Sequence, residues 1–231
     1  MISSVDRIKW YGYTPGGGLL SPDGKYFLLQ IPKNASTFLG NCLTANGWTF
    51  KNLERINLKD VVQLAVLRDP VDRWLSGFAT YAALYLFEWG YGSDHFIDEY
   101  NPLVEKMVFT TLVFDDHTAH QTMFLEQFDS SNEIVYFDCK RETLVDSLSK
   151  YTGFDIKVTD SIIDNSREDN YDTRNMYDFF KNKLDVKSKY LKPMNEVERF
   201  FNLKDISLRD RIYRIYQSDF KLIETVKFYG T

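Results

Sequence analysis

The sequence predicts an α/β fold in three layers, with helices on both faces of a central sheet of mainly parallel strands. Residues 61–67 are almost all apolar, as expected of a parallel strand that is buried on both faces. Strand-like runs alternate along the chain with segments of helical periodicity, which is typical of parallel sheets flanked by helices. The 231 residues are 44% hydrophobic and 26% charged, so we expect a single domain over 1–231.

The first elements follow from turn residues and apolar runs. Residues 1–25 are expected to form an irregular entry, because Gly16–Gly18 favours a flexible loop. A strand is predicted over Tyr26–Ile31. A helix is predicted over Ser36–Ala45, since the following Asn46-Gly47 is a common helix ending.

The middle of the chain continues this alternation. Val61–Leu67 is the second predicted strand. A helix is then predicted to begin at Pro70, a favoured first helical position, with Asp69 as its cap. Its apolar face recurs at helical spacing at Val71, Trp74, Leu75, Phe78 and Ala82. Residues 94–128 are expected to be helical, with a break near Asp115–His117.

The last part of the chain predicts one more strand and two more helices. The strand is expected at Glu133–Phe137 and a helix at Leu144–Tyr151. Residues 155–175 are polar and are expected to be irregular. A final helix is indicated by apolar side chains at helical spacing, Ile212, Tyr216, Ile223 and Val226.

The bulk composition excludes several classes of partner. A net charge of −5 provides no basic field for nucleic acid, so no nucleic-acid partner is expected. Cys42 and Cys139 are too few for a disulfide framework and have no metal-ligand spacing, so no metal is expected. The first residues lack a signal-peptide core, and no run approaches the roughly 18 apolar residues of a membrane helix. We therefore expect a soluble, cytoplasmic protein without a membrane partner.

One loop has the features of a phosphate site. The predicted strand is followed by Pro32, Lys33, Asn34, Ala35, Ser36 and Thr37. Backbone N–H groups at a helix start favour anions, and a lysine beside them adds a full positive charge. Lys33, the N–H groups of residues 34–37 and the two hydroxyls could therefore hold one phosphate and its neighbour. The alternative is that Ser36 only caps the helix and Lys33 is solvated.

This loop differs from a Walker A loop, which wraps a triphosphate with the help of glycines. Residues 26–37 contain no glycine, and the lysine precedes the small residues rather than following a glycine. The loop is therefore expected to be shorter and stiffer than a Walker A loop.

A second anion site is predicted where the apolar strand ends. Arg68 directly follows this strand, at the carboxyl end of the sheet, where ligands bind in open α/β folds. Ser76 lies two turns into the next helix, so its hydroxyl and the arginine can meet around one phosphate. Arg73 lies on a neighbouring part of the helix surface. Its alternative role is a salt bridge to Asp69, one turn back.

Together the two segments resemble the sulfotransferases that use 3′-phosphoadenosine 5′-phosphosulfate (PAPS). In that family a Pro-Lys-x-Ala/Gly-Ser/Thr-Ser/Thr loop holds the 5′-phosphosulfate, and here it stands as Pro32–Thr37. The 3′-phosphate site is an arginine followed eight residues later by a serine, often within Arg-Asp-Pro-x-x-Arg-x-x-Ser, and here it stands as Arg68–Ser76. The resemblance implies a P-loop-like three-layer fold, PAPS as donor and 3′-phosphoadenosine 5′-phosphate (PAP) as product.

Further segments are similar to the carbohydrate branch of this family. Asp116–Gln121 is similar to its Asp/Glu-His-x-x-x-Gln segment, and Ile212–Phe220 to its C-terminal helix with a Tyr-x-x-Asp-Phe/Tyr pattern. Asp164–Arg167 is similar to an Asn-x-Ser stretch found late in that branch. Golgi members of this branch carry a membrane anchor and several cysteines, whereas this sequence has no run of membrane-helix length and two cysteines. The resemblance therefore implies a soluble bacterial or viral relative. The implied acceptor is a hydroxyl of a glycan or another small molecule.

Sulfuryl transfer is in-line and loose, so positioning and charge stabilisation carry most of the catalysis. The resemblance assigns Lys33 to the charge that develops on the leaving oxygen. His117 is the candidate base, because an unperturbed histidine titrates near neutrality. His120, Glu126 and Glu88 remain alternative bases.

Two other functions remain open. A P-loop-type small-molecule kinase would need glycines in the loop and an acidic metal ligand at a strand end, whereas Asp69 is better explained as a helix cap. A non-catalytic module that binds adenosine bisphosphate would keep both anion sites and lack the base. Neither explains both anion sites and the C-terminal segment as economically.

Overall fold

The computed structural model describes residues 16–82, 112, 113, 115–159 and 208–230. The chain divides into two compact units. One, the sheet unit, comprises residues 1–68, 120–168 and 221–231, and the other, the helical unit, comprises residues 69–119 and 169–220.

The sheet unit has an α/β structure with the strand order β3-β1-β2-β4-β5. The strands are β1 (Gly17–Leu20), β2 (Tyr26–Leu29), β3 (Thr49–Asn52), β4 (Val62–Leu67) and β5 (Ile134–Asp138). β4 pairs in parallel with β2 and β5, whereas β1 pairs antiparallel with β2 and β3. The predicted α/β class is confirmed, but the sheet is mixed rather than mainly parallel.

The antiparallel half of the sheet comes from two strands that the sequence did not predict. Gly17 and Gly18 of the expected irregular entry lie in β1, where the ring of Phe50 fills the space that a side chain at Gly17 would need and the ring of Phe27 fills that at Gly18. β3 is exposed along its whole length, so it lacks the apolar pattern that marks a strand. Tertiary packing therefore overrides the loop preference of the glycines.

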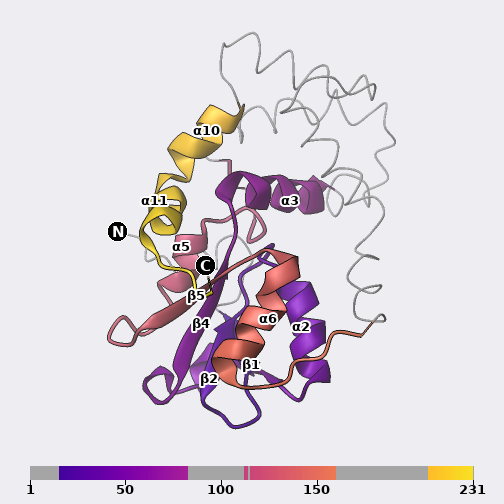
Figure 1. Cartoon of the computed structure of the whole chain (residues 1–231). Helices are drawn as coiled ribbons and strands as arrows, with labels where there is room; N and C mark the ends of the chain where they lie inside the picture. Colours follow the sequence, from indigo (N-terminus) through magenta and orange to yellow (C-terminus); the bar gives the residue numbers. More distant parts are fainter. Residues whose placement is uncertain (1–15, 83–111, 114, 160–207, 231) are drawn as a thin grey trace. The chain divides into compact units, whose positions relative to one another are not determined.

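Two helices cover one face of this sheet. α2 (Ser36–Ala45), which has the predicted bounds, and α6 (Arg141–Thr152) lie over this face (Figure 1) and share one apolar cluster with the strands. The strand side chains of this cluster are Leu19, Leu28, Leu64, Val66 and Phe137. The helix side chains are Phe38, Leu39, Cys42, Leu43, Leu144, Val145 and Leu148.

The segment around α5 (Gln121–Leu125) lies over the other face. Because side chains alternate along a strand, Gln63 points away from the face that carries Leu64. The Gln63 Nε2 donates to the Asp129 carbonyl oxygen at 2.9 Å, and its Oε1 accepts from the Asp129 N–H at 2.8 Å. The residues that follow α5 therefore contact the second face of the sheet.

The C-terminal residues extend the edge at β5. Phe228 forms a parallel bridge with Tyr136, whose carbonyl accepts a 2.8 Å hydrogen bond from the Tyr229 N–H. The ring of Tyr229 packs against Tyr151 and Phe137, with centroid distances of 4.8 and 5.8 Å. The C-terminal residues therefore pair with β5 at Tyr136.

The strand order creates a switch point between β2 and β4. After β2 the chain returns through α2 to β3, on one side of this pair, whereas the strand that follows β4 is β5, on the other side. β2 and β4 are parallel neighbours, so their carboxyl ends lie side by side. Open α/β sheets bind ligands at such points.

The helical unit contains α3 (Pro70–Ala82) and α10 (Leu208–Ile215), and α11 (Gln217–Thr225) begins in it. Asp69 caps α3 as predicted, because its Oδ1 accepts from the Val71 and Asp72 N–H groups at 2.9 and 3.0 Å. The buried side chains of this unit include Val71, Trp74, Leu75, Ile212 and Tyr216.

Other expectations for this part of the chain are met only in part. The final helix predicted from one apolar stripe is divided at Tyr216 into α10 and α11. Most of the helix expected over 94–128 lies outside the described residues. In the part of this range that the structure describes, Asp115–Thr118 forms a turn and α5 is helical. Among the described helices, none combines the length and apolar character needed to cross a bilayer.

Candidate functional site

The loop between β2 and α2 has an uncommon backbone. Lys33 and Ala35 have φ angles of 68° and 58°, in the left-handed region that residues with side chains rarely adopt. Such strain is often found at functional sites. Ala35 occupies the cap position of α2 without a side chain that can accept a hydrogen bond, and the first turn has no acidic residue. This helix start can therefore receive an anion.

The Asn34 side chain anchors this loop to β4 and Gln121. Its side chain is 2% exposed, and its Nδ2 donates to the Val66 carbonyl at 2.7 Å and to the Gln121 Oε1 at 2.6 Å. Its backbone N–H donates to the Ile31 carbonyl at 3.2 Å. The N–H groups of Asn34 thus donate to acceptors within the protein. Asn34 therefore contributes to the predicted phosphate site by fixing the shape of the loop.

Arg68 meets the same loop from the end of β4. Its Nη1 donates to the Lys33 carbonyl oxygen at 3.1 Å. Its backbone is held by Gln121, whose Oε1 accepts from the Arg68 N–H at 3.0 Å and whose Nε2 donates to the Arg68 carbonyl at 2.8 Å. Lys33 and Arg68, predicted from separate motifs, are therefore brought together at the switch point.

Gln121 belongs to this site, although the sequence analysis did not predict it as a site residue. It is fully buried and bonds both the Arg68 backbone and the Asn34 side chain. The signal for it was present, because Gln121 closes the Asp/Glu-His-x-x-x-Gln segment. A buried amide needs partners for each of its polar atoms, and here it finds them at the ends of two elements.

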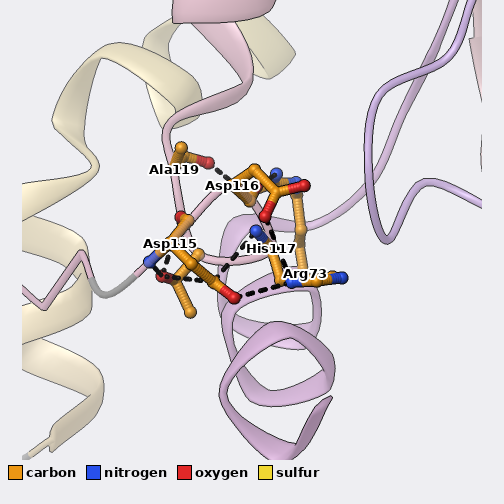
Figure 2. Close-up of polar contacts among 6 residues, drawn as sticks. Arg73, Asp115, Asp116, His117 and Ala119 are labelled. Carbon is orange, nitrogen blue, oxygen red and sulfur yellow. Dashed lines mark hydrogen bonds and ion pairs between the residues drawn. The ribbon is translucent and has the colours of Figure 1, made fainter. Parts of the chain in front are cut away.

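The helical unit contains a second arrangement, a turn over Asp115–Ala119 that carries His117 (Figure 2). Asp115 holds this histidine twice: its Oδ1 accepts from the His117 N–H at 3.0 Å, and its Oδ2 lies 2.7 Å from the His117 Nδ1. A proton on Nδ1 satisfies this carboxylate and leaves Nε2 as an acceptor. The pair therefore has the form of an oriented base.

Asp116 adds a third polar group to the turn. Its Oδ1 lies 3.3 Å from the His117 Nδ1. Burial raises the pKa of the Asp116 carboxyl, an effect that His117 opposes and Asp115 reinforces. Ligand atoms of these three residues lie within 4.8 Å of one another, so a cation could be held here. We assign no metal to the turn, because the Arg73 guanidinium already supplies positive charge beside it.

α3 supports this turn through Arg73, Trp74 and Gly77. Arg73 is 1% exposed, and its guanidinium donates to the carbonyl oxygens of Ala119 and, at 3.4 Å, of Asp116. The Trp74 Nε1 donates to the Leu112 carbonyl at 2.8 Å. A Cβ at Gly77 would collide with the His117 carbonyl. Arg73 was predicted as a nucleotide ligand, and the structure places its guanidinium on the backbone of the His117 turn.

The C-terminal segment supports the turn as well. The hydroxyl of Tyr216, a buried residue that follows α10, shares its one proton between the carbonyl oxygens of Leu112 and Thr118. Tyr216 belongs to the Tyr-x-x-Asp-Phe/Tyr pattern of the sequence, which thus contributes to the histidine turn rather than forming a separate site.

The remaining predicted residues lie as follows. Ser36 and Thr37 open α2, Ser76 lies half-buried on α3, and His120 directly precedes α5. Glu126 is exposed at the end of α5. Glu88 and Asp164–Arg167 lie outside the described residues.

The comparisons with known proteins add no relative. No protein-family model, curated protein or solved structure matches this chain.

Proposed function

We propose that this protein is a PAPS-dependent sulfotransferase, which transfers a sulfuryl group to a hydroxyl of a carbohydrate or another small acceptor and releases PAP. The observation that supports this most is the meeting of Lys33 and Arg68 at the carboxyl ends of β2 and β4. The Arg68 guanidinium there, with Lys33 in the same loop and a helix start without an acidic residue, suits an anionic nucleotide. The two sequence motifs point to PAPS among such ligands.

In the proposed reaction, the bond between sulfur and the bridging oxygen of the 5′-phosphate breaks and its electron pair leaves with PAP. A new sulfur–oxygen bond forms to the acceptor hydroxyl. Lys33 stabilises the charge on the bridging oxygen, and the start of α2 holds the 5′-phosphate. Arg68 and Ser76 are the proposed ligands of the 3′-phosphate, as the sequence resemblance implies. The proton of the acceptor passes to His117, which Asp115 orients.

A donor assay tests the proposal directly. Incubation with sulfur-labelled PAPS and a panel of hydroxyl acceptors is expected to give labelled product, and EDTA should not abolish it, because the proposed site uses Lys33 instead of a metal. His117→Ala should retain affinity for PAP and lose turnover, by about 10²–10⁴-fold for a general base. Transfer of phosphate from ATP in place of sulfate would favour a kinase. PAP binding without any turnover in the unaltered protein would favour a binding module.

The 3′-phosphate assignment has its own test. Arg68→Ala and Ser76→Ala are each expected to weaken PAP by about tenfold or more, since hydrogen bonds to charged groups are worth about 1.5–3 kcal/mol. Adenosine 5′-phosphate, which lacks the 3′-phosphate, should be affected much less. Calorimetry measures the affinity of each variant for both ligands. An equal loss of affinity for PAP and for adenosine 5′-phosphate would show that the two residues do not form the 3′-phosphate site.

A further inference from the structure

We infer that Gln121 is a positioning residue that couples the Lys33 loop to Arg68, so that a phosphate bound at one strengthens binding at the other. This inference rests on the proposed function, because it concerns the same nucleotide. It assigns to a buried neutral amide, which touches no ligand, a share in nucleotide affinity.

The four residues form a closed ring of contacts. The Lys33 carbonyl accepts from the Arg68 guanidinium, the Arg68 backbone is bonded at both its N–H and its carbonyl by Gln121, and Gln121 accepts from Asn34, the chain neighbour of Lys33. Asn34 and Gln121 are 2% and 0% exposed. Hydrogen bonds in such buried networks reinforce one another.

Coupling follows from this ring. An anion at the loop fixes the peptide group of Lys33, whose carbonyl can position the Arg68 guanidinium only while Gln121 holds the Arg68 backbone in place. An anion bound by Arg68 fixes the same guanidinium. Since both ligand groups order one network, the second binds to a site that the first has already ordered. Linkage requires the effect to be reciprocal.

The matched control lies in the same sheet. Gln63 is also fully buried, and its amide also makes reciprocal hydrogen bonds, to Asp129. It stands near the start of β4, whereas Gln121 acts at the end of that strand. Gln121→Met and Gln63→Met therefore remove similar buried amides, and only the first breaks the ring.

The first measurement uses four ligands: PAP, adenosine 5′-phosphate, adenosine 3′-phosphate and adenosine. In the unaltered protein the two phosphates together should improve affinity by about tenfold more than the product of their separate effects. Gln121→Met should reduce this factor toward one, and Gln63→Met should leave it unchanged. If Gln121 had only a structural role, both variants would be less stable than the unaltered protein, and Gln121→Met would keep the same coupling factor as Gln63→Met.

The second measurement needs no nucleotide. Hydrogen exchange followed by NMR should show the Arg68 amide exchanging about tenfold faster in Gln121→Met, because Gln121 is the acceptor of this N–H. Gln63→Met should not change it. If Gln121→Met fails to fold, Gln121→Glu keeps an acceptor for Asn34 and Arg68 and removes the donor to the Arg68 carbonyl, so a partial loss of coupling is expected.

The outcomes separate the two proposals. An unchanged Arg68 exchange rate, or a coupling factor that survives in the Gln121 variants or falls equally in Gln63→Met, overturns the role of Gln121. If the unaltered protein binds none of the adenosine phosphates, the proposed function and the coupling both fail, and the anchoring of Arg68 is still decided by exchange.

Discussion

Lys33→Ala is expected to lower the rate of sulfuryl transfer by about 10²–10³-fold, the usual loss when a group that stabilises transition-state charge is removed. Lys33 stands between β2 and α2, in a loop that the Asn34 side chain ties to the Val66 carbonyl at the end of β4. The substitution removes the ammonium group and keeps this anchor. Because this charge matters most in the transition state, kcat should fall more than the affinity for PAP.

Lys25 provides the control for this experiment. It directly precedes β2, and its exposed ammonium pairs with Asp23 at 3.3 Å. Exposed pairs of this kind contribute little to stability, so Lys25→Ala should retain nearly full activity. Steady-state kinetics of both variants with labelled PAPS provide the measurement. Undiminished transfer by Lys33→Ala would exclude Lys33 from the mechanism.

Gly77→Ala is expected to lower the free energy of unfolding by about 2 kcal/mol, the typical cost of forcing extra atoms into a packed site. The added Cβ would collide with the His117 carbonyl and come within 3.2 Å of the Thr118 Cγ2. The backbone carbonyl cannot rotate away as a flexible side chain would, so either α3 or the histidine turn must shift. Turnover should fall with stability, since this turn carries the proposed base.

The matched control is Gly40→Ala in α2, another glycine within a helix. A Cβ at Gly40 would meet only the amide end of Gln30, at 2.9 Å, which can move. The helix preference of alanine, about 1 kcal/mol over glycine, should then leave this variant as stable as the parent or more so. Denaturant unfolding gives both free energies. Equal stability of the two variants would contradict the close approach at Gly77.

Local signals predicted the elements that depend on local chemistry. α2 has its predicted bounds, and the cap at Asp69 and the start of α3 at Pro70 are as expected. β4 was recognisable because it is buried on both faces. β1 and β3 were not, because a glycine run and an exposed edge strand carry no apolar period, and their pairing is decided by distant residues.

The candidate site was predictable in its motifs but not in its connections. Lys33 and Arg68 were predicted as anion ligands, and their contact through the Lys33 carbonyl needs the register of two strands. Asn34 and Gln121 are 87 residues apart, so no local pattern pairs them. The burial of Arg73 was equally hidden, since helical spacing shows which residues share a surface but not what covers it.

The bridge between Phe228 and Tyr136 affects the order in which the sheet unit can fold during synthesis. The sheet unit draws on three separate stretches, and the last of them contains Phe228 and Tyr229. Because Phe228 is made about 90 positions after Tyr136, this bridge forms late in synthesis, in the manner of folds dominated by non-local contacts. Until then the backbone at Tyr136 lacks this partner, and unpaired strand edges promote aggregation during folding.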